Sequence, residues 1–282
     1  MPSIERDIGT TADRTVLPEP GILLAHVPAE MPRIRQGENW GRVDAWSTVR
    51  RTETGRFIDI MFDTVGTSLT LARNSELYAE DQPVEQFYRV ESGAVRTCKI
   101  LNDGRRQIDG FYLPGDIVGI EAGSRHLYAA EALVRTTLRA VKVRNVRSQA
   151  ADGGEMALEL WDMIARELRR SQDHIQLLSR RSAQERLASF LLAMSERDTG
   201  KYMSERDTGK YMSERDTGKP MASIQQTIDL PMSRQDMADY LGLTIETVSR
   251  TFTQLEAQGV LELVTARRIK VNNRMALCDM HG

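Results

Sequence analysis

The chain is poor in cysteine and aromatic residues and contains no long hydrophobic run. Its two cysteines, Cys98 and Cys278, lie far apart and form no CxxC spacing, which argues against a disulfide framework or a metal site. No window approaches the roughly 18 apolar residues of a membrane span, so we expect no membrane partner. The first residues include acids and no apolar core, so they do not resemble a signal peptide. These absences favour a cytoplasmic protein.

Composition is that of an ordinary globular protein of modular build. The length of 282 residues fits about two domains, and 40% hydrophobic and 28% charged content is typical of such proteins. A net charge of −2 gives no support for general binding to polyanions, so affinity for nucleic acid must come from the placement of charges. An enzyme is a rival class, but the sequence shows no nucleophile–base pair, paired carboxylates or phosphate loop.

Residues 233–252 carry the most specific pattern of the chain. They predict a short helix, a turn at Gly242 and a second helix, the arrangement that enters a DNA major groove. Ser233 is placed to cap the first helix and Thr244 the second. The second helix then has an apolar inner face and a polar outer face, which carries Glu246, Thr247, Ser249 and Arg250.

The outer face of the second helix has the chemistry of a DNA reader. Arginine donates two hydrogen bonds to a guanine edge, and glutamate accepts one from cytosine. Alternatively, Glu246 and Arg250 form only a surface ion pair, worth about 0.3–0.5 kcal/mol. The next segment favours DNA, because residues 261–264 and 268–271 predict a two-stranded wing. Ser233, Thr244, Thr247, Arg267 and Arg268 are expected to support the motif or to contact the DNA backbone.

The run Leu241-Gly-Leu-Thr-x-Glu-Thr-Val-Ser-Arg250 resembles the recognition motif of the CRP/FNR superfamily of bacterial transcription regulators. Its Glu-x-x-Ser-Arg form is that of the FNR branch, and the overall similarity is closest to FixK-type regulators of the low-oxygen and nitrogen-fixation response. The similarity extends through residues 176–190 and more loosely back to about Leu77. This resemblance implies a homodimeric activator in the bacterial cytoplasm, with palindromic double-stranded DNA and RNA polymerase as partners.

The same resemblance implies roles for individual residues. Glu246, Ser249 and Arg250 would read a half-site of TTGAT type, with Arg250 on the guanine. Two subunits would bind the inverted repeat TTGAT-N4-ATCAA.

We expect an α+β fold with a cyclic-nucleotide-type β-roll, a long dimerisation helix and a C-terminal winged helix-turn-helix. Short β runs broken by turns at Gly93, Gly104 and Gly115 predict the β-rich part. Strands are expected at residues 57–62, 85–90, 94–100 and 107–113. The predicted divisions are an irregular arm at 1–45, the β-roll at 46–150, the dimerisation helix and the start of the DNA-binding domain at 151–194, a linker at 195–221 and the winged domain at 222–282.

The β-roll departs from the pattern of its nucleotide-binding relatives. Those proteins place an arginine in an Arg-Ser/Ala-Ala run, whereas here Tyr128 precedes the two alanines and Glu121 stands one position late. Arg125 lies in a loop without an obvious phosphate cradle. The arm also lacks the cysteines that hold an iron–sulfur cluster. We therefore expect no cofactor and no metal, and keep a cyclic-nucleotide-responsive regulator of the same fold as the alternative. The four histidines, His26, His126, His174 and His281, occur singly.

One helix is expected from residue 155 to residue 194. Apolar residues recur along it at steps of three and four, which is the pattern of a seam in a parallel dimer. Trp161 is expected to pack the helix against the β-roll. Arg180 and Arg181 form either a phosphate contact or a solvated helix end. The predicted seam consists of Met156, Leu160, Ile164, Leu168 and Ile175.

A nine-residue unit occurs three times in tandem. Residues 195–203 recur identically at 204–212, and again at 213–221 with Pro220 in place of tyrosine. The unit is too short for a solenoid repeat, so we interpret it as a hinge loop lengthened by duplication. Because loop-closure entropy grows slowly with length, function is expected to tolerate the extra copies, with looser coupling between the domains.

Overall fold

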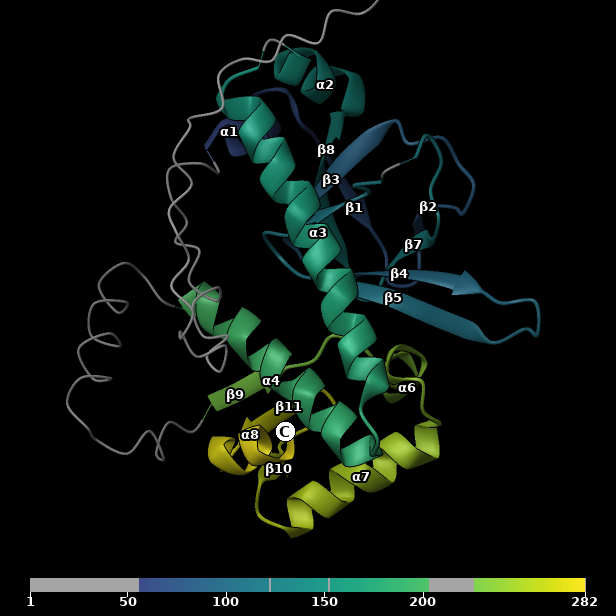
Figure 1. Ribbon diagram of the computed structural model, residues 1–282, viewed down its shortest axis with the longest axis vertical. Coiled ribbons are helices and arrows are strands. Elements are labelled where there is room, and N and C mark those ends of the chain that lie inside the picture. The colour runs from purple at the N-terminus through teal and green to yellow at the C-terminus, as the bar shows by residue number, and fades with distance from the viewer. Residues whose placement is uncertain (1–55, 122, 152, 203–225, 282) are drawn as a thin grey trace, which may run out of the picture. The chain divides into compact units, whose positions relative to one another are not determined.

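The computed structural model describes residues 56–121, 123–151, 153–202 and 226–281 (Figure 1). The arm predicted at residues 1–45 lies outside these residues, and so do the second and third copies of the repeat. In the described part, a β-rich segment is followed by long helices and then by a small domain of helices and strands. This order confirms the predicted α+β fold.

The β-rich segment consists of two four-stranded antiparallel sheets that follow a helix, α1 (Arg56–Val65). Their strand orders, β1-β8-β3-β6 and β2-β7-β4-β5, bring together strands that are distant in the sequence. This arrangement confirms the β-roll. The strands are β1 (Thr67–Leu71), β2 (Glu76–Tyr78), β3 (Gln86–Ser92), β4 (Val95–Ile100), β5 (Arg106–Tyr112), β6 (Ile117–Val118), β7 (Ala129–Ala132) and β8 (Thr136–Lys142).

Strand β8 and the turn before β4 illustrate why the sequence folds this way. Thr136, Leu138 and Ala140 alternate toward the interior of β8, as the two-residue period of a strand requires. Gly93 adopts a φ of 86° in the turn between β3 and β4. A Cβ atom at this position would lie 2.5 Å from the Thr136 hydroxyl, so the turn requires glycine.

The prediction of a strand at residues 57–62 is wrong, because these residues lie in α1. Ile58, Met61 and Phe62 are buried on one helical face. A distant carboxylate also completes the first turn of this helix. The oxygens of Glu159 accept hydrogen bonds from the backbone N–H groups of Phe57, at 3.0 Å, and of Ile58, at 2.7 Å. Local sequence does not reveal such a partner.

The single helix predicted for residues 155–194 is also wrong, since the structure has two. After α2 (Val143–Ala151), α3 (Glu155–Ser179) ends at Arg180, which has a φ of −61° and a ψ of 141°. Helix α4 (Ala183–Tyr202) begins after Ser182, whose hydroxyl accepts a hydrogen bond from Glu185 N at 3.1 Å. The Glu185 carboxylate accepts in return from Arg181 N at 3.2 Å. This local capping explains the break.

The first copy of the repeat is not a hinge loop, because residues 195–202 continue α4. Ser195 is buried, and its hydroxyl donates to the backbone oxygen of Leu192 at 2.8 Å. Arg197 donates to the backbone oxygen of Phe111 at 3.0 Å and pairs with Asp116. Contacts with the β-roll and with the body of α4 thus extend the helix into a segment whose composition suggested a loop.

Helix α3 has a buried face and an exposed apolar face. Met156 and Met163 are buried in a cluster with α1, and Leu160 is partly buried against it. Met156 is therefore a core residue of its own protomer, which corrects its assignment to the seam. Trp161 is 70% exposed, so the expectation that it packs against the β-roll is wrong. The large apolar residues of α3 that are exposed are Leu158, Trp161, Ile164, Leu168 and Ile175, called here the α3 stripe.

The C-terminal domain has the predicted helix-turn-helix and wing, with one strand more than expected. Strand β9 completes a three-stranded sheet of order β10-β11-β9. The buried core of the domain includes Ile228, Met232, Met237, Phe252 and Leu277. The elements are β9 (Gln226–Asp229), α6 (Arg234–Leu241), α7 (Ile245–Ala257), β10 (Leu261–Leu263), β11 (Arg268–Val271) and α8 (Arg274–His281).

Candidate nucleic-acid interface

The first helix of the motif, α6, begins with the predicted cap. The Ser233 hydroxyl accepts a hydrogen bond from Asp236 N at 3.1 Å, and the Asp236 carboxylate accepts from Ser233 N at 2.9 Å. This reciprocal capping box satisfies two backbone donors that the helix leaves open. The helix ends at Gly242 in the left-handed conformation, with a φ of 63°. The predicted turn is thus confirmed.

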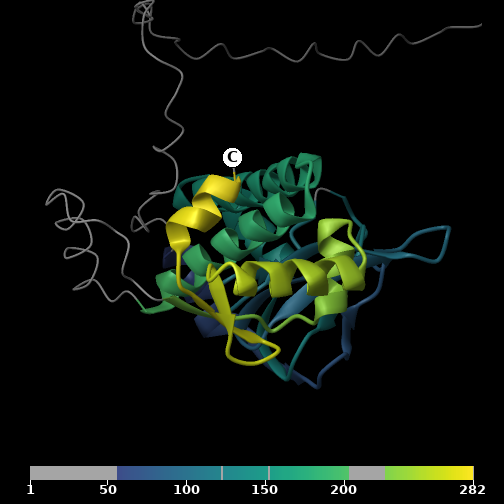
Figure 2. The same cartoon turned by 90° about the horizontal axis from the view of Figure 1, so that it is seen from below.

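The second helix, α7, is held on its inner face. The Thr244 hydroxyl accepts from Thr247 N at 3.2 Å and caps the helix, as predicted. Val248, Phe252 and Leu255 are buried against the rest of the domain. Figure 2 shows α7 crossing the near side of the molecule, with the strands of the wing beside it. The inner contacts therefore fix which residues of α7 face outward.

Glu246, Ser249 and Arg250 lie exposed together on the outer face, and Thr247 is half-buried beside them. Within the described residues no ion pair joins Glu246 to Arg250, which counts against a purely structural pair. The pKa of Glu246 is lowered because its own backbone N–H and the Thr244 hydroxyl donate to the carboxylate. The charged carboxylate is a hydrogen-bond acceptor, and the guanidinium beside it is a donor. This combination suits the edges of base pairs.

The wing supplies less free positive charge than its sequence suggests. The Arg268 guanidinium donates to both carboxylate oxygens of Asp229, at 2.7 and 3.0 Å. Lys270 lies 3.7 Å from Glu262. Arg267 is half-buried, and its backbone oxygen accepts from Leu230 N at 2.7 Å. A contact from Arg268 to a phosphate would have to compete with its bond to Asp229.

Sequence reasoning missed the groups that hold the end of α6. Arg186 of α4 donates to the backbone oxygen of Leu241 at 3.0 Å. His174 of α3 lies with its Nε2 atom 2.8 Å from the backbone oxygen of Tyr240, and the two rings stack at 4.0 Å. A cation and an imidazole at these carbonyls suit the C-terminal end of a helix. Nothing in the spacing of these residues signals the role, because α3 and α4 reach α6 only in the folded chain.

Arg234 is a second residue that the sequence did not single out. It is the first residue of α6, and its guanidinium lies 3.2 Å from the centroid of the Phe252 ring. Burial lowers the pKa of Arg234 to about 10, so the side chain remains charged at neutral pH. The arginine links the start of α6 to the inner face of α7.

Tyr78, Glu121 and His126 of the β-roll lie in contact with one another. The His126 ring stacks on Tyr78 at 3.6 Å, and its Nδ1 lies 3.4 Å from Glu121. Arg125 instead donates to the backbone oxygen of Asp81 at the surface.

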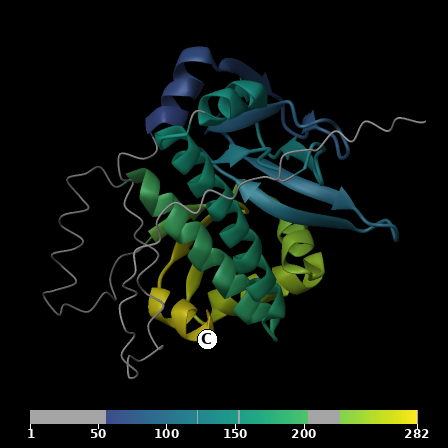
Figure 3. The ribbon, with the colours of Figure 1, turned by 45° about the horizontal axis from the view of Figure 1, so that its top comes forward.

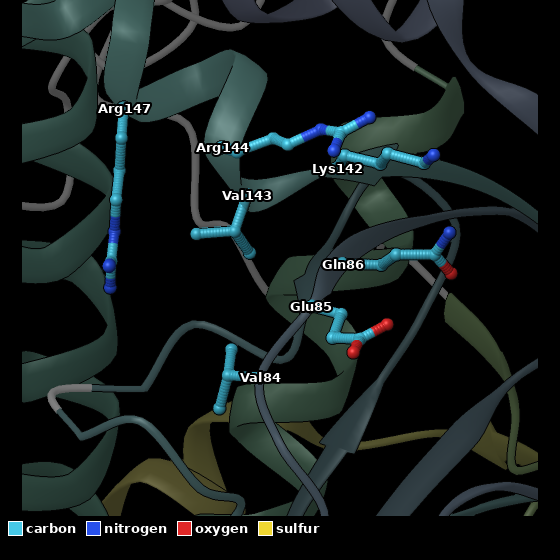
Figure 4. Close-up of a pocket in the computed structure, with 7 residues that line it drawn as sticks. All are labelled: Val84, Glu85, Gln86, Lys142, Val143, Arg144 and Arg147. Atoms are coloured by element: carbon cyan, nitrogen blue, oxygen red, sulfur yellow. The ribbon is translucent and has the colours of Figure 1, made fainter.

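The β-roll also carries a surface pocket (Figure 4). It measures about 410 Å³ and is lined by Val84, Glu85, Gln86, Lys142, Val143, Arg144 and Arg147. These residues belong to β3, β8, α2 and the loop before β3, and none belongs to the helix-turn-helix. Figure 4 shows Lys142 and Arg144 extending side by side, while Arg147 runs apart from them. The cations do not converge on one point.

Among the described residues, no helix is long and apolar enough to cross a membrane, and no group of three or more His, Cys, Asp or Glu side chains is arranged to hold a metal ion. Cys98 and Cys278 are both free thiols.

Comparisons with known proteins agree with this geometry. Residues 185–280 match the family of Crp-like helix-turn-helix domains, and residues 68–151 match the family of cyclic nucleotide-binding domains. The nitrogen fixation regulation protein FixK of Azorhizobium caulinodans is 44% identical over 213 residues, which cover 76% of this chain and 78% of that protein. FixK of Rhizobium meliloti is 39% identical over 202 residues, or 72% and 81% of the two chains. The solved structure of FixK2 from Bradyrhizobium japonicum matches with a TM-score of 0.65 and 41% identity, covering 77% of this chain and 98% of that one.

Proposed function

The chain belongs to the CRP/FNR family of transcription regulators and is close to FixK, and from this premise we propose that it activates transcription by binding an inverted repeat of TTGAT-N4-ATCAA type as a homodimer. Its relatives are regulators rather than enzymes. The proposed setting is the low-oxygen or nitrogen-fixation response of a bacterial cytoplasm, with RNA polymerase as the protein partner. The outer face of α7, with Glu246, Ser249 and Arg250 exposed together, is the observation that carries the proposal.

Each residue of this face has a proposed role. Arg250 donates two hydrogen bonds to the guanine of TTGAT, Glu246 accepts from a cytosine amino group, and Ser249 contacts an adjacent base. Ser233, Thr244 and Thr247 support the motif from the helix N-termini, where N–H groups also approach phosphates. Arg267 and Arg268 serve the DNA backbone from the wing.

The α3 stripe is the proposed dimer interface. Trp161, Leu168 and Ile175 recur every seven residues on the exposed face of α3, and Ile164 lies between them. A parallel pairing of two such helices would remove these side chains from water. Two recognition helices would then lie about one DNA turn, ~34 Å, apart, as an inverted repeat requires.

The corrected helix bounds refine the proposed division of the chain. The β-roll ends with α2 and α3 carries the dimer interface. The DNA-binding part, whose start the sequence placed within residues 151–194, begins with α4.

Selection of DNA from a randomised duplex pool tests the proposal directly. The expected result is enrichment of two TTGAT half-sites in inverted orientation, separated by four base pairs. Enrichment of an unrelated motif would reject the operator, and recovery of no motif at all would reject sequence-specific binding.

A further inference from the structure

Two arginines of the β-roll reach the first helix of the DNA-binding motif. Arg96 on β4 and Arg106 on β5 each donate to the same oxygen of Asp236, both at 2.7 Å. The Nε atom of Arg106 also donates to Asp239 at 2.7 Å. Figures 1 and 3 show the β4–β5 hairpin beside α6. These four residues are called here the arginine clasp.

Because its charged groups are buried, the clasp forms only when the β4–β5 hairpin lies against α6. Asp236 is only 4% exposed and Arg96 only 8%. Arg96 also donates from its Nε atom to Glu131 at 3.0 Å, which helps to balance its charge. Buried charges are stable only while paired, so a shift of α6 away from the hairpin would leave them unpaired. Asp236 and Arg96 therefore both favour the arrangement in which α6 lies against the hairpin.

Asp236 connects the clasp to the fold of the motif itself. One carboxylate oxygen accepts from Ser233 and closes the capping box, while the other accepts from the two arginines. Burial acts to raise the pKa of Asp236, but the hydrogen bonds from Ser233 and the charges of Arg96 and Arg106 outweigh it and lower the pKa. The carboxylate is thus charged and fully engaged at neutral pH.

Helix α6 is held at its other end as well. Arg186 and His174 bind its last carbonyl groups from α4 and α3. Phe111 of β5 adds apolar contact, with its ring 5.1 Å from that of Tyr240. The buried side chains of α6 pack with those of α7 in one core, so the two helices move together. Fixing α6 at both ends therefore fixes the direction of α7 relative to α3.

We propose that the arginine clasp holds the recognition helix in its DNA-binding orientation without a small-molecule effector, with Arg106 and Asp239 acting as positioning residues. This inference rests on the proposed function. In the arrangement that the clasp stabilises, the outer face of α7 and the α3 stripe are both exposed. This arrangement is held by hydrogen bonds between groups of the protein itself.

Substitution of the less buried pair tests the clasp. In the full-length dimer, Arg106→Gln and Asp239→Asn are each expected to lower affinity for the TTGAT-N4-ATCAA repeat by roughly fivefold or more, the usual lower range of coupling between sites. The exchange Arg106→Asp with Asp239→Arg is expected to recover part of the loss. Arg105→Gln is the matched control, because Arg105 is the neighbouring residue of the hairpin and pairs only locally, at 2.7 Å from Asp103. It is expected to bind as the unaltered protein does.

Two further readouts separate positioning from direct contact or general damage. A loosened α7 should accept a six-base-pair spacer with less penalty than the unaltered protein does. If Arg106 contacted a phosphate instead, Arg106→Gln would make the plot of log affinity against log salt concentration shallower, by about 0.9 in the magnitude of its slope. Thermal unfolding and sedimentation identify variants that remain folded dimers, and only these are compared.

The outcomes distinguish the two proposals. Unchanged or tighter binding by the folded Arg106 and Asp239 variants, or an equal loss in Arg105→Gln, overturns the clasp. A reduced salt slope overturns it in favour of a DNA contact. Failure of the unaltered protein to prefer the repeat over random DNA rejects the proposed function itself, whatever the variants do.

Discussion

Helices α3 and α7 each present an exposed face, but the two faces have opposite chemistry. The face of α3 is a row of large apolar side chains, among them Trp161, Leu168 and Ile175. The face of α7 carries Glu246, Ser249 and Arg250, which are charged or polar. An apolar stripe is suited to a surface like itself, whereas charged donors and acceptors suit base edges and phosphates. The two faces thus suit the two partners proposed above, a second copy of the chain for α3 and DNA for α7.

The comparison predicts that the apolar face matters most to operator binding, because it determines whether two recognition helices act together. Ile164→Glu with Leu168→Glu would place like charges in the proposed seam. We expect monomers in sedimentation and loss of tight binding to a single operator, since one half-site supplies only part of the contacts.

Arg166→Glu is the control for this prediction, because Arg166 is exposed on another side of α3. It should leave the dimer intact. Persistence of the dimer in the double variant would place the interface elsewhere and remove the proposed distinction between the two faces.

Substitution on the polar face should give a smaller and more selective effect. Arg250→Ala is expected to cost ~1–3 kcal/mol on the cognate repeat, with binding to random DNA nearly unchanged. Competition gel shifts with cognate and scrambled duplexes measure the difference. Arg147→Ala, an exposed arginine at the β-roll pocket, is the matched control and should change neither. Equal losses on both duplexes would make Arg250 a phosphate or structural residue.

A titratable group in the interior of the β-roll should affect the stability of the protein without changing the exposed faces of α3 and α7. Burial raises the pKa of Glu121 from 4.5 to about 7, so the folded protein binds this proton more tightly than the unfolded chain does. The free energy of unfolding should therefore fall as pH rises from about 4.5 to about 7, by roughly 3 kcal/mol, and then level off.

Thermal unfolding at pH 6 and pH 8 checks this prediction. Glu121→Gln should raise the melting temperature at pH 8 and flatten the pH dependence, whereas Glu85→Gln, at an exposed site, should do neither. Burial also lowers the pKa of His126, beside Glu121, from its usual 6.5. Its contribution to the free energy of unfolding therefore falls as the pH drops below about 6.5, which opposes the effect of Glu121. If the melting temperature of Glu121→Gln depended on pH as strongly as that of the unaltered protein, the predicted pH dependence would not come from Glu121.

The smallest expected effect concerns the support beneath the polar face. Ser233→Ala removes the hydroxyl that caps α6 and should lower stability by ~1 kcal/mol in urea titrations. Ser233→Thr, which keeps a hydroxyl, should lose less. Cognate binding at low temperature should change little in either variant, since neither removes a base contact. A large loss of binding in Ser233→Ala alone would instead make the hydroxyl a DNA contact.

The helix-turn-helix was predictable because its determinants lie within a few residues of one another. Ser233 with Asp236, Gly242 and Thr244 define both helices through local hydrogen bonds and backbone conformation. The β-roll was predicted in kind and in three strands and three turns of its β3–β5 region. Its other strands, β1, β2, β6, β7 and β8, pair with partners that are distant in the sequence. Periodicity alone gave no sign of those pairings.

The errors have the same physical origin. An apolar run became α1 because it packs on α3, and the first repeat copy became helical because Arg197 meets the β-roll. Trp161 was expected to pack against the β-roll, whereas the path of α3 leaves it exposed. The arginine clasp joins residues more than a hundred positions apart, so no motif in the sequence announces it.

The bond between Glu159 and the start of α1 has a consequence for synthesis of the chain. The two partners are 101 and 102 positions apart. A helix of 10 residues is marginal by itself in water, so α1 depends on a carboxylate that the ribosome has not yet added when α1 emerges. The N-terminal part of the β-roll must therefore wait, incomplete, until α3 has been translated. Early release of a truncated chain would leave Ile58, Met61 and Phe62 exposed to aggregation or proteolysis.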